Sequence, residues 1–313
     1  LGNLPIISPS SAKGYLDMET LSIDLPPKKL LDLVSDLYNA IFAADIYDDL
    51  LLRYRPYAQD FEELDAHAER SQNELENLLE AKGASFSTLS QWVTKNIETF
   101  KKLSIQGVKR FPLVLYIGEI YMRQHDPHTD HVIRKLESQG LELIRGPVHE
   151  WLRYVTYLAW RNTRNMSYKV ADFYMDWTEG KFMRILKEEL GSRHVIPLPR
   201  RIIQQAEKDG VYHGDVMGES ALAIGLFNEY LKGRLNGGSG ICGIFHVGPF
   251  TCMQEGVSTA KMRALLKEHR KKDPSLLVPI IHAFFGDSPN PNLDAEIAAF
   301  REQCYLKARK DTV

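Results

Sequence analysis

Apolar side chains recur at helical spacing through about the first hundred residues. This spacing predicts a helix that opens at Pro26-Pro27, because proline is tolerated in a first turn, and two further helices at about 57–81 and 86–103. No catalytic pattern stands out in these segments. Residues 1–105 are therefore expected to form a mainly helical region.

Short apolar runs replace the helical pattern from Lys109 onward. Four of them are typical of buried strands, since turn residues bound each run: 111–117, 141–145, 241–247 and 276–285. Pro279 places the last run at a sheet edge or at an irregular position. Helical segments alternate with the runs, so the strands should be parallel with right-handed crossovers. The predicted fold class is α/β, with a mainly parallel Rossmann-like sheet in a domain over 106–313 and a long helical insertion at about 150–215.

The third run leads to the first candidate site residue. It ends at Gly248-Pro249, which forces a turn, and a helix is expected at 260–272. Cys252 then lies in the loop between the carboxyl end of a strand and a helix N-terminus. Open parallel sheets bind ligands at that edge, and a helix N-terminus favours an anion such as a thiolate. The alternative interpretation of Cys252 is a small, buried structural thiol.

Three loops follow carboxyl ends of predicted strands, at residues 118–123, 248–256 and 286–292. A parallel sheet brings all three to one edge. There Glu119 is a candidate acid or base and Arg123 a candidate anion clamp, although a salt bridge that fixes the loops explains both residues equally well. We expect Asp287 to share a concave edge with Glu119 and Cys252.

The histidines and the other cysteines are less promising as ligands. His246 lies inside an apolar run, which favours a hydrogen-bonded core histidine over a metal ligand. The three histidines at 125–131 lie in a polar loop without a carboxylate or cysteine pattern, so metal binding is not expected there. Cys242 is in mid-strand and Cys304 is on an amphipathic helix, and both are expected to be buried.

Composition narrows the class of protein. The 313 residues carry a net charge of -2 and no long basic block, which argues against nucleic-acid binding. No apolar run approaches the roughly 20 residues of a membrane span, and three cysteines are too few for a secreted disulfide framework. The cytoplasm is the expected location. The chain has no phosphate-cradling glycine loop, so it is not expected to bind ATP with magnesium.

Four segments together resemble a known family. They are Gly118-Glu-Ile-Tyr-Met-Arg123, the helix 131–140, His246-Val-Gly-Pro-Phe-Thr-Cys-Met253 and the tail 287–300. This set resembles the second α/β domain of 2-hydroxyacyl-CoA dehydratase-like proteins. It is most similar to the C-terminal part of the large fused CoA-substrate-specific enzyme activases. The resemblance covers about residues 109–150 and 215–305.

The resemblance implies paired α/β domains that hold an oxygen-sensitive iron–sulfur cluster through cysteines. An ATP-hydrolysing activator domain or subunit passes a low-potential electron to that cluster, in anaerobic metabolism of acyl-CoA substrates. Cys252 matches the cysteine that follows the family's Pro-Phe motif, so it is the implied cluster ligand. A cluster needs three or four cysteines, so the other ligands would come from a longer parent protein or another subunit.

On this interpretation the chain is a fragment of an iron–sulfur, low-potential electron-transfer protein from a dehydratase or activase system of lyase or reductase type. The fragment alone would be inactive and would lack the cluster. One alternative is a non-catalytic scaffold that docks the activator, with Cys252 as a structural thiol. Another is a metal-free enzyme for small molecules that uses Glu119 and Arg123.

Overall fold

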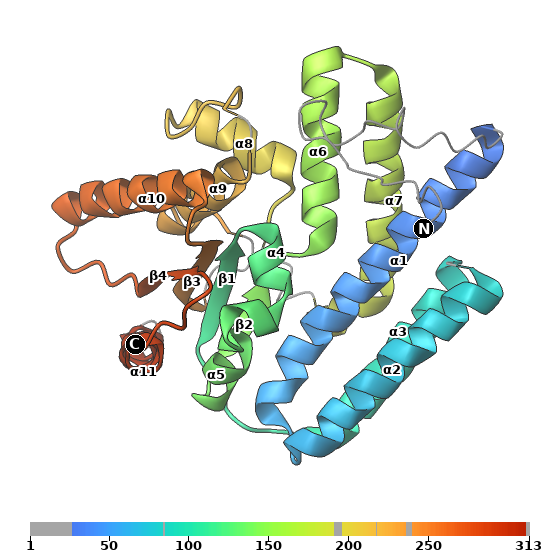
Figure 1. Ribbon diagram of the computed structural model, residues 1–313, viewed down its shortest axis with the longest axis horizontal. Coiled ribbons are helices and arrows are strands. Elements are labelled where there is room, and N and C mark those ends of the chain that lie inside the picture. Colours follow the sequence, from blue (N-terminus) through green and yellow to red (C-terminus); the bar gives the residue numbers. More distant parts are fainter. Residues whose placement is uncertain (1–26, 84, 191–195, 217, 236–239, 311–313) are drawn as a thin grey trace, which may run out of the picture.

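The computed structural model describes residues 27–83, 85–190, 196–216, 218–235 and 240–310, so the expectation for residues 1–26 lies outside it. Its centre is one parallel sheet of four strands (Figure 1), made of β1 (Leu113–Gly118), β2 (Glu142–Arg145), β3 (Ile241–Pro249) and β4 (Ile280–Phe285). The strand order is β2-β1-β3-β4, and every pairing is parallel. The α/β class and the single parallel sheet are therefore confirmed. β4 is an edge strand that starts directly after Pro279, as the proline predicted.

Some of the described helices cover the two faces of this sheet, and the others pack together beside it. The described helices are α1 (Pro27–Tyr54), α2 (Phe61–Lys82), α3 (Phe86–Leu103), α4 (Ile120–Gln124), α5 (Val132–Ser138), α6 (Val148–Thr163), α7 (Met166–Leu190), α8 (Pro199–Lys208), α9 (Ser220–Leu231), α10 (Met253–Lys272) and α11 (Leu293–Lys310). Local capping fixes several starts. The Ser85 hydroxyl accepts the N–H of Thr88 at 3.2 Å at the start of α3, and Asp60 caps α2 in the same way.

Side chains alternate between the two faces of the sheet, so the strands are covered on both sides. Leu115, Ile117 and Ile244 pack against α8, α9 and α10. On the other face, Tyr116 and Phe245 pack against α5 and α11. Both faces are thus buried, which explains why the strands appear as continuous apolar runs in the sequence.

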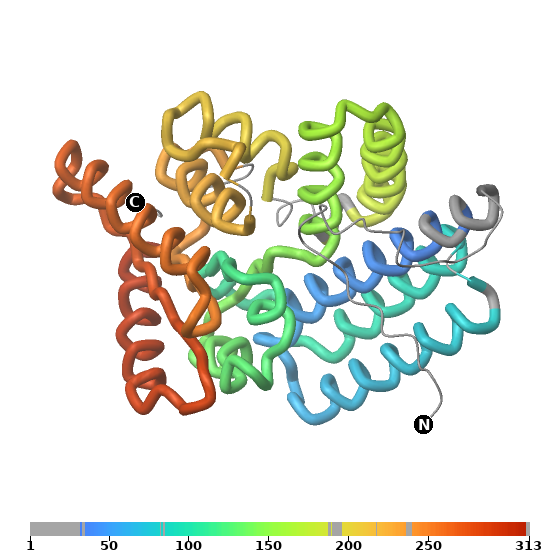
Figure 2. The backbone as a smooth tube through the Cα atoms, turned by 45° about the horizontal axis from the view of Figure 1, so that its top comes forward, coloured from blue at the N-terminus to red at the C-terminus, as the bar shows by residue number. Residues whose placement is uncertain are grey.

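The helical N-terminal region packs against a segment from the middle of the chain. Helices α1 to α3 share one core, and α7 adds Phe182 and Leu186 to it. Figure 2 shows α1 to α3 and α7 on one side of the molecule and α10 and α11 on the other. The predicted helical insertion therefore returns to the N-terminal helices, and charged pairs such as Arg55 with Glu137 (2.7 Å) join those helices to the α/β part.

One helix starts earlier than expected. The sequence placed its start at residue 260, whereas α10 begins at Met253, directly after Cys252. The N–H of Cys252 donates to the carbonyl of Pro249 at 3.0 Å, so the turn after β3 is tight and the helix follows at once. The loop that was expected over 248–256 is therefore about half as long, and Cys252 is the N-cap residue itself.

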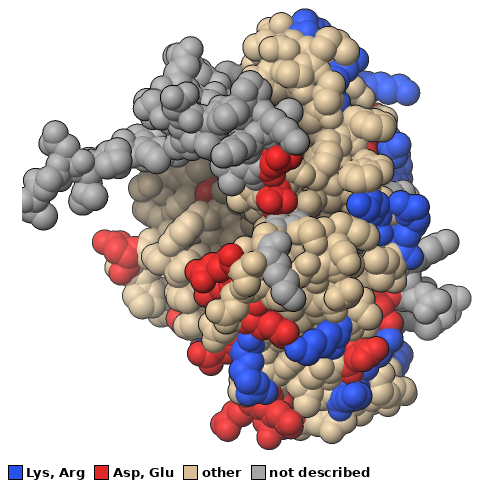
Figure 3. All heavy atoms as spheres, turned by 90° about the vertical axis from the view of Figure 1, so that its right-hand side faces the viewer, with Lys and Arg blue, Asp and Glu red and all other residues tan. Residues whose placement is uncertain are grey.

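Two observations describe the helices and the surface charge. Within the part of the chain that is described, no helix combines the length and the apolar composition needed to cross a bilayer. Both acidic and basic side chains are exposed on the face shown in Figure 3.

Candidate functional site at the carboxyl edge of the sheet

The carboxyl ends of β1 and β3 lie side by side at the point where the strand order reverses. The chain runs from β1 outward to β2 on one side and continues with β3 on the other side. In open parallel sheets this reversal opens a crevice in which ligands bind. The residues after Gly118 and Pro249 therefore form the first candidate site.

Gly118 holds the two loops in register. Its φ of 133° lies in the region that favours glycine, and an added Cβ would lie 1.9 Å from the carbonyl oxygen of Val247. The next residue, Glu119, donates its N–H to that same carbonyl at 3.0 Å. The backbone of the β1 loop is thus bonded directly to β3, with no room for a side chain between them.

Glu119 and Arg123 do not pair with each other. The Glu119 carboxylate accepts the N–H of Met122 at 2.8 Å and so caps α4. Arg123 is 4 % exposed, and its Nη1 donates to Glu150 at 2.7 Å. Arg123 therefore forms its salt bridge with Glu150 on α6, and the described residues hold no ion pair between Arg123 and Glu119. Catalytic roles for Glu119 and Arg123 stay predictions, and the geometry gives both residues structural contacts.

Glu219 is a site residue that the sequence did not reveal. It precedes α9, and its carboxylate accepts the N–H of Ile120 at 2.8 Å. Burial raises the pKa of Glu219 to about 7, with a smaller contribution from the charge of Glu119, while Arg123 opposes the shift. The sequence did contain one signal for Glu219, an acidic residue directly before an apolar helix. The sequence did not indicate that Glu219 lies beside Glu119, which is 100 residues away in the chain.

Cys252 lies at the same edge, half-buried, between two strongly exposed apolar side chains. Phe250 is 77 % exposed and Met253 is 80 % exposed. The 20-residue helix α10 starts directly after Cys252, so this residue is at the positive end of the helix dipole, although its side chain makes no capping hydrogen bond. The loop after β4 is next to it, because the N–H of Phe250 donates to the carbonyl of Phe285 at 2.8 Å. Asp287, on that loop, is exposed.

The other two cysteines are buried, as expected, and lie away from this edge. Cys242 is 4 % exposed and Cys304 is fully buried, both in the core between the sheet and α11. With a rise of about 3.3 Å per residue, β3 carries Cys242 about 23 Å away from Pro249. Cys242 and Cys304 therefore cannot join Cys252 around one cluster. Among the described residues, no group of three or more His, Cys, Asp or Glu side chains is arranged to hold a metal ion. These residues do not by themselves form an iron–sulfur site.

His246 is a hydrogen-bonded core histidine, as the sequence predicted. It is fully buried, its Nε2 is 2.5 Å from the Glu255 carboxylate, and its Nδ1 is 3.2 Å from Nδ1 of His282. Burial lowers the pKa of His282 to about 3, so this second ring is neutral. The contact between His246 and Glu255 joins β3 to the first turn of α10, and the contact between His246 and His282 joins β3 to β4.

Comparison of the chain with protein-family models, with curated proteins and with solved structures found no match.

Proposed function

We propose that this chain belongs to an iron–sulfur, low-potential electron-transfer protein related to the 2-hydroxyacyl-CoA dehydratases and their ATP-dependent activators. The observation that carries the proposal is the position of Cys252. It is the only one of the three cysteines outside the core, and it lies at the carboxyl edge of a parallel sheet and at the start of a long helix. Cysteine thiolates are the usual ligands of iron–sulfur clusters.

In this proposal the chain provides one ligand and a second polypeptide provides the others. The described residues offer a single accessible thiol, flanked by the exposed side chains of Phe250 and Met253. Exposed apolar residues of this size are suited to burial against a partner. The proposed occupant of this edge is a further cysteine-bearing domain or subunit, and an ATP-hydrolysing activator delivers the electron. An acyl-CoA is the proposed substrate of the assembled system.

Anaerobic reconstitution tests this proposal. The chain is incubated with ferrous iron, sulfide and an excess of 2-mercaptoethanol, whose thiols stand in for the ligands that a partner would provide. We expect the wild-type chain to retain iron and inorganic sulfide after desalting, and Cys252→Ser to lose both. Cys242→Ala is the matched control, because it removes a thiol from the core and leaves Cys252 in place. A wild-type chain without iron, or Cys252→Ser with as much iron as the wild type, contradicts the proposal.

The exposure of Phe250 and Met253 also favours a second candidate, a docking scaffold in which Cys252 is only a structural thiol. In that case the two apolar side chains, and not the thiol, determine binding to the activator. The double variant Phe250→Ser, Met253→Ser should then weaken co-precipitation with the purified activator, while Cys252→Ser should leave it unchanged and no variant should hold iron.

A further inference from the structure

Two histidines and a tyrosine come together on the segment that follows β1. Tyr121 lies on α4, His125 follows the last residue of that helix, and His128 lies in the short 3-10 helix Asp126–Thr129. Their spacing of i, i+4 and i+7 is that of one helical face, and the three side chains stay together although the helix changes type between them. Tyr121 is 50 % exposed and His128 is exposed, so solvent reaches the cluster.

The polar atoms of these side chains lie close together. Nδ1 of His125 is 2.6 Å from Nδ1 of His128, and the hydroxyl of Tyr121 is 3.1 Å from the same nitrogen of His128. The two imidazole rings cross at 66° with their centroids 4.4 Å apart, and the phenol ring stacks on His125. Two nitrogen lone pairs at this distance repel each other, so either a proton or a metal ion must lie between them.

The backbone holds these groups in place before any ligand binds. The N–H of His125 donates to the carbonyl of Tyr121 at 2.9 Å, and the N–H of His128 donates to the carbonyl of His125 at 3.1 Å. Thr129 is fully buried, and its hydroxyl donates to the carbonyl of Asp126 at 2.9 Å. The segment therefore loses little backbone freedom on binding, which favours affinity.

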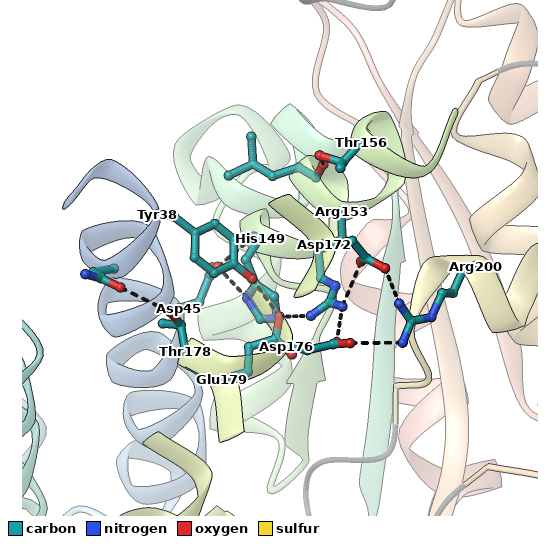
Figure 4. Close-up of polar contacts among 12 residues, drawn as sticks. Tyr38, Asp45, His149, Arg153, Thr156, Asp172, Asp176, Thr178, Glu179 and Arg200 are labelled. Carbon is teal, nitrogen blue, oxygen red and sulfur yellow. Dashed lines mark hydrogen bonds and ion pairs between the residues drawn. The ribbon is translucent and has the colours of Figure 1, made fainter. Parts of the chain in front are cut away.

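His125 and His128 differ from other histidines in what their rings contact. Four described histidines have a carboxylate oxygen within 3.6 Å of a ring nitrogen: His131, His149, His213 and His246. The bond between His149 and Asp45, at 2.9 Å, belongs to the buried network in Figure 4. Among the described residues, no carboxylate forms such a pair with His125 or His128, and their Nδ1 atoms face each other. Both nitrogens are therefore placed to bind one metal ion.

The separation of the two nitrogens favours one coordination geometry. With metal–nitrogen bonds of about 2.0 Å, neighbouring ligands lie about 3.3 Å apart in a tetrahedral site and about 2.8 Å apart in a square-planar site. The 2.6 Å between the Nδ1 atoms of His125 and His128 is closer to the square-planar value. Square-planar coordination by nitrogen and oxygen is typical of Cu(II) and Ni(II), and Cu(II) is bound most tightly among the divalent metals of its row.

We propose that this cluster is a surface site for Cu(II). Nδ1 of His125 and Nδ1 of His128 are two neighbouring ligands in the plane, the phenol oxygen of Tyr121 is the third, and water completes the coordination. The metal replaces the proton between the two rings, so binding releases protons. The site shares no residue with the one proposed at Cys252.

The sequence did not favour metal binding at these histidines, because spacing alone shows neither the turn that brings the two rings together nor the contribution of Tyr121. The site also differs from a group of three or more His, Cys, Asp or Glu side chains, which the described part of the chain lacks. Two histidines and one phenol hydroxyl form it instead.

Calorimetric titration with copper(II) chloride, kept in solution by glycine, measures the site. Every sample carries Cys252→Ser, because a thiol also binds copper. We expect one Cu(II) per chain with a Kd of about 1 µM, and binding of Zn²⁺ that is at least about tenfold weaker. Electron spin echo spectroscopy of the copper-loaded chain should show two coupled imidazole rings, and its absorption spectrum should contain a phenolate-to-copper charge-transfer band.

Variants connect the binding to the named groups. His125→Gln and His128→Gln should each weaken Cu(II) binding at least about tenfold and leave a single coupled ring in the spin echo spectrum. Tyr121→Phe, which removes only the hydroxyl, should weaken binding and abolish the charge-transfer band. His131→Asn is the matched control and should leave the affinity unchanged, because it removes the neighbouring histidine and asparagine tolerates the left-handed backbone there (φ 54°).

Four results overturn the proposal. They are a Kd for Cu(II) above about 100 µM, binding of Zn²⁺ as tight as that of Cu(II), a copper-loaded chain without the charge-transfer band, and unchanged affinity in both His125→Gln and His128→Gln. A loss of affinity in His131→Asn as large as in those two variants contradicts the ligand set as well.

Discussion

Replacing Glu219 by glutamine removes one buried, titrating carboxyl group from the carboxyl edge while keeping its shape. The carboxylate accepts the N–H of Ile120 at 2.8 Å, and the glutamine side-chain carbonyl can accept the same bond. The variant therefore isolates the effect of the charge. The neighbouring carboxylates of Glu119 and Glu255 both oppose that charge, and burial opposes it more strongly.

The magnitude follows from the pKa of Glu219, which burial raises from 4.5 to about 7. Below pH 4.5 the group is protonated in the folded and in the unfolded chain, so it has no effect on the pH dependence of stability. Between pH 4.5 and 7 only the unfolded chain loses the proton, and the free energy of unfolding falls as the pH rises. Above pH 7 the loss levels off at about 3 kcal/mol, because each pKa unit corresponds to about 1.4 kcal/mol.

Urea unfolding of the wild type and of Glu219→Gln from pH 4 to pH 8 measures this effect. We expect equal stability near pH 4 and a variant that is more stable by about 2–3 kcal/mol at pH 8. Glu302→Gln, which changes an exposed carboxylate on α11, is the control and should follow the wild type at every pH. If the curves of Glu219→Gln and the wild type stay parallel over the whole range, the explanation of the raised pKa is wrong.

Three further results are expected. In urea unfolding, Gly118→Ala should lower the free energy of unfolding by at least about 3 kcal/mol, because the added Cβ would meet the carbonyl of Val247. Gly256→Ala, at a position in α10 with open space, should raise it by about 0.5–1 kcal/mol. A small loss of stability in Gly118→Ala would refute the close contact with Val247. Under native thiol labelling followed by mass spectrometry, Cys252 should react well before Cys242 and Cys304, because both of these thiols are buried and burial also raises the pKa of Cys304. Labelling of all three cysteines at the same rate would contradict this. Mg-ATP should leave the melting temperature unchanged. A ligand that binds at 100 times its Kd would raise the free energy of unfolding by about 2.7 kcal/mol, so a rise of several degrees in the melting temperature would show that the chain has a phosphate site.

The sequence predicted the sheet well, because each strand is marked by residues that are neighbours in the chain. Each strand is a short, largely apolar segment with glycine or proline at its ends, and β1, β2 and β3 are buried on both faces. The start of α10 was missed for a local reason as well. Gly248, Pro249 and Gly256 suggested a long loop, whereas the turn closes within four residues at Cys252 and Gly256 lies in the helix without strain.

The site was harder to predict, because its contacts join distant segments. The exposure of Cys252 and the burial of the other two thiols follow from local pattern and were expected. The bond between Asp45 and His149 spans 104 residues, and no spacing rule relates them. Glu219 beside Ile120 is a similar case at a separation of 99 residues. Such pairs depend on how α1 and α9 pack against the sheet, which periodicity does not specify.

The proposed binding of iron by residue 252 is tested most directly by replacing its sulfur atom with selenium. The chain is produced with selenocysteine at Cys252, reconstituted anaerobically with iron, sulfide and 2-mercaptoethanol, and examined by X-ray absorption at the selenium edge. We predict an iron atom at bonding distance from the selenium. A selenium atom surrounded only by carbon, in a sample that contains iron, would contradict the claim and leave Cys252 a structural thiol.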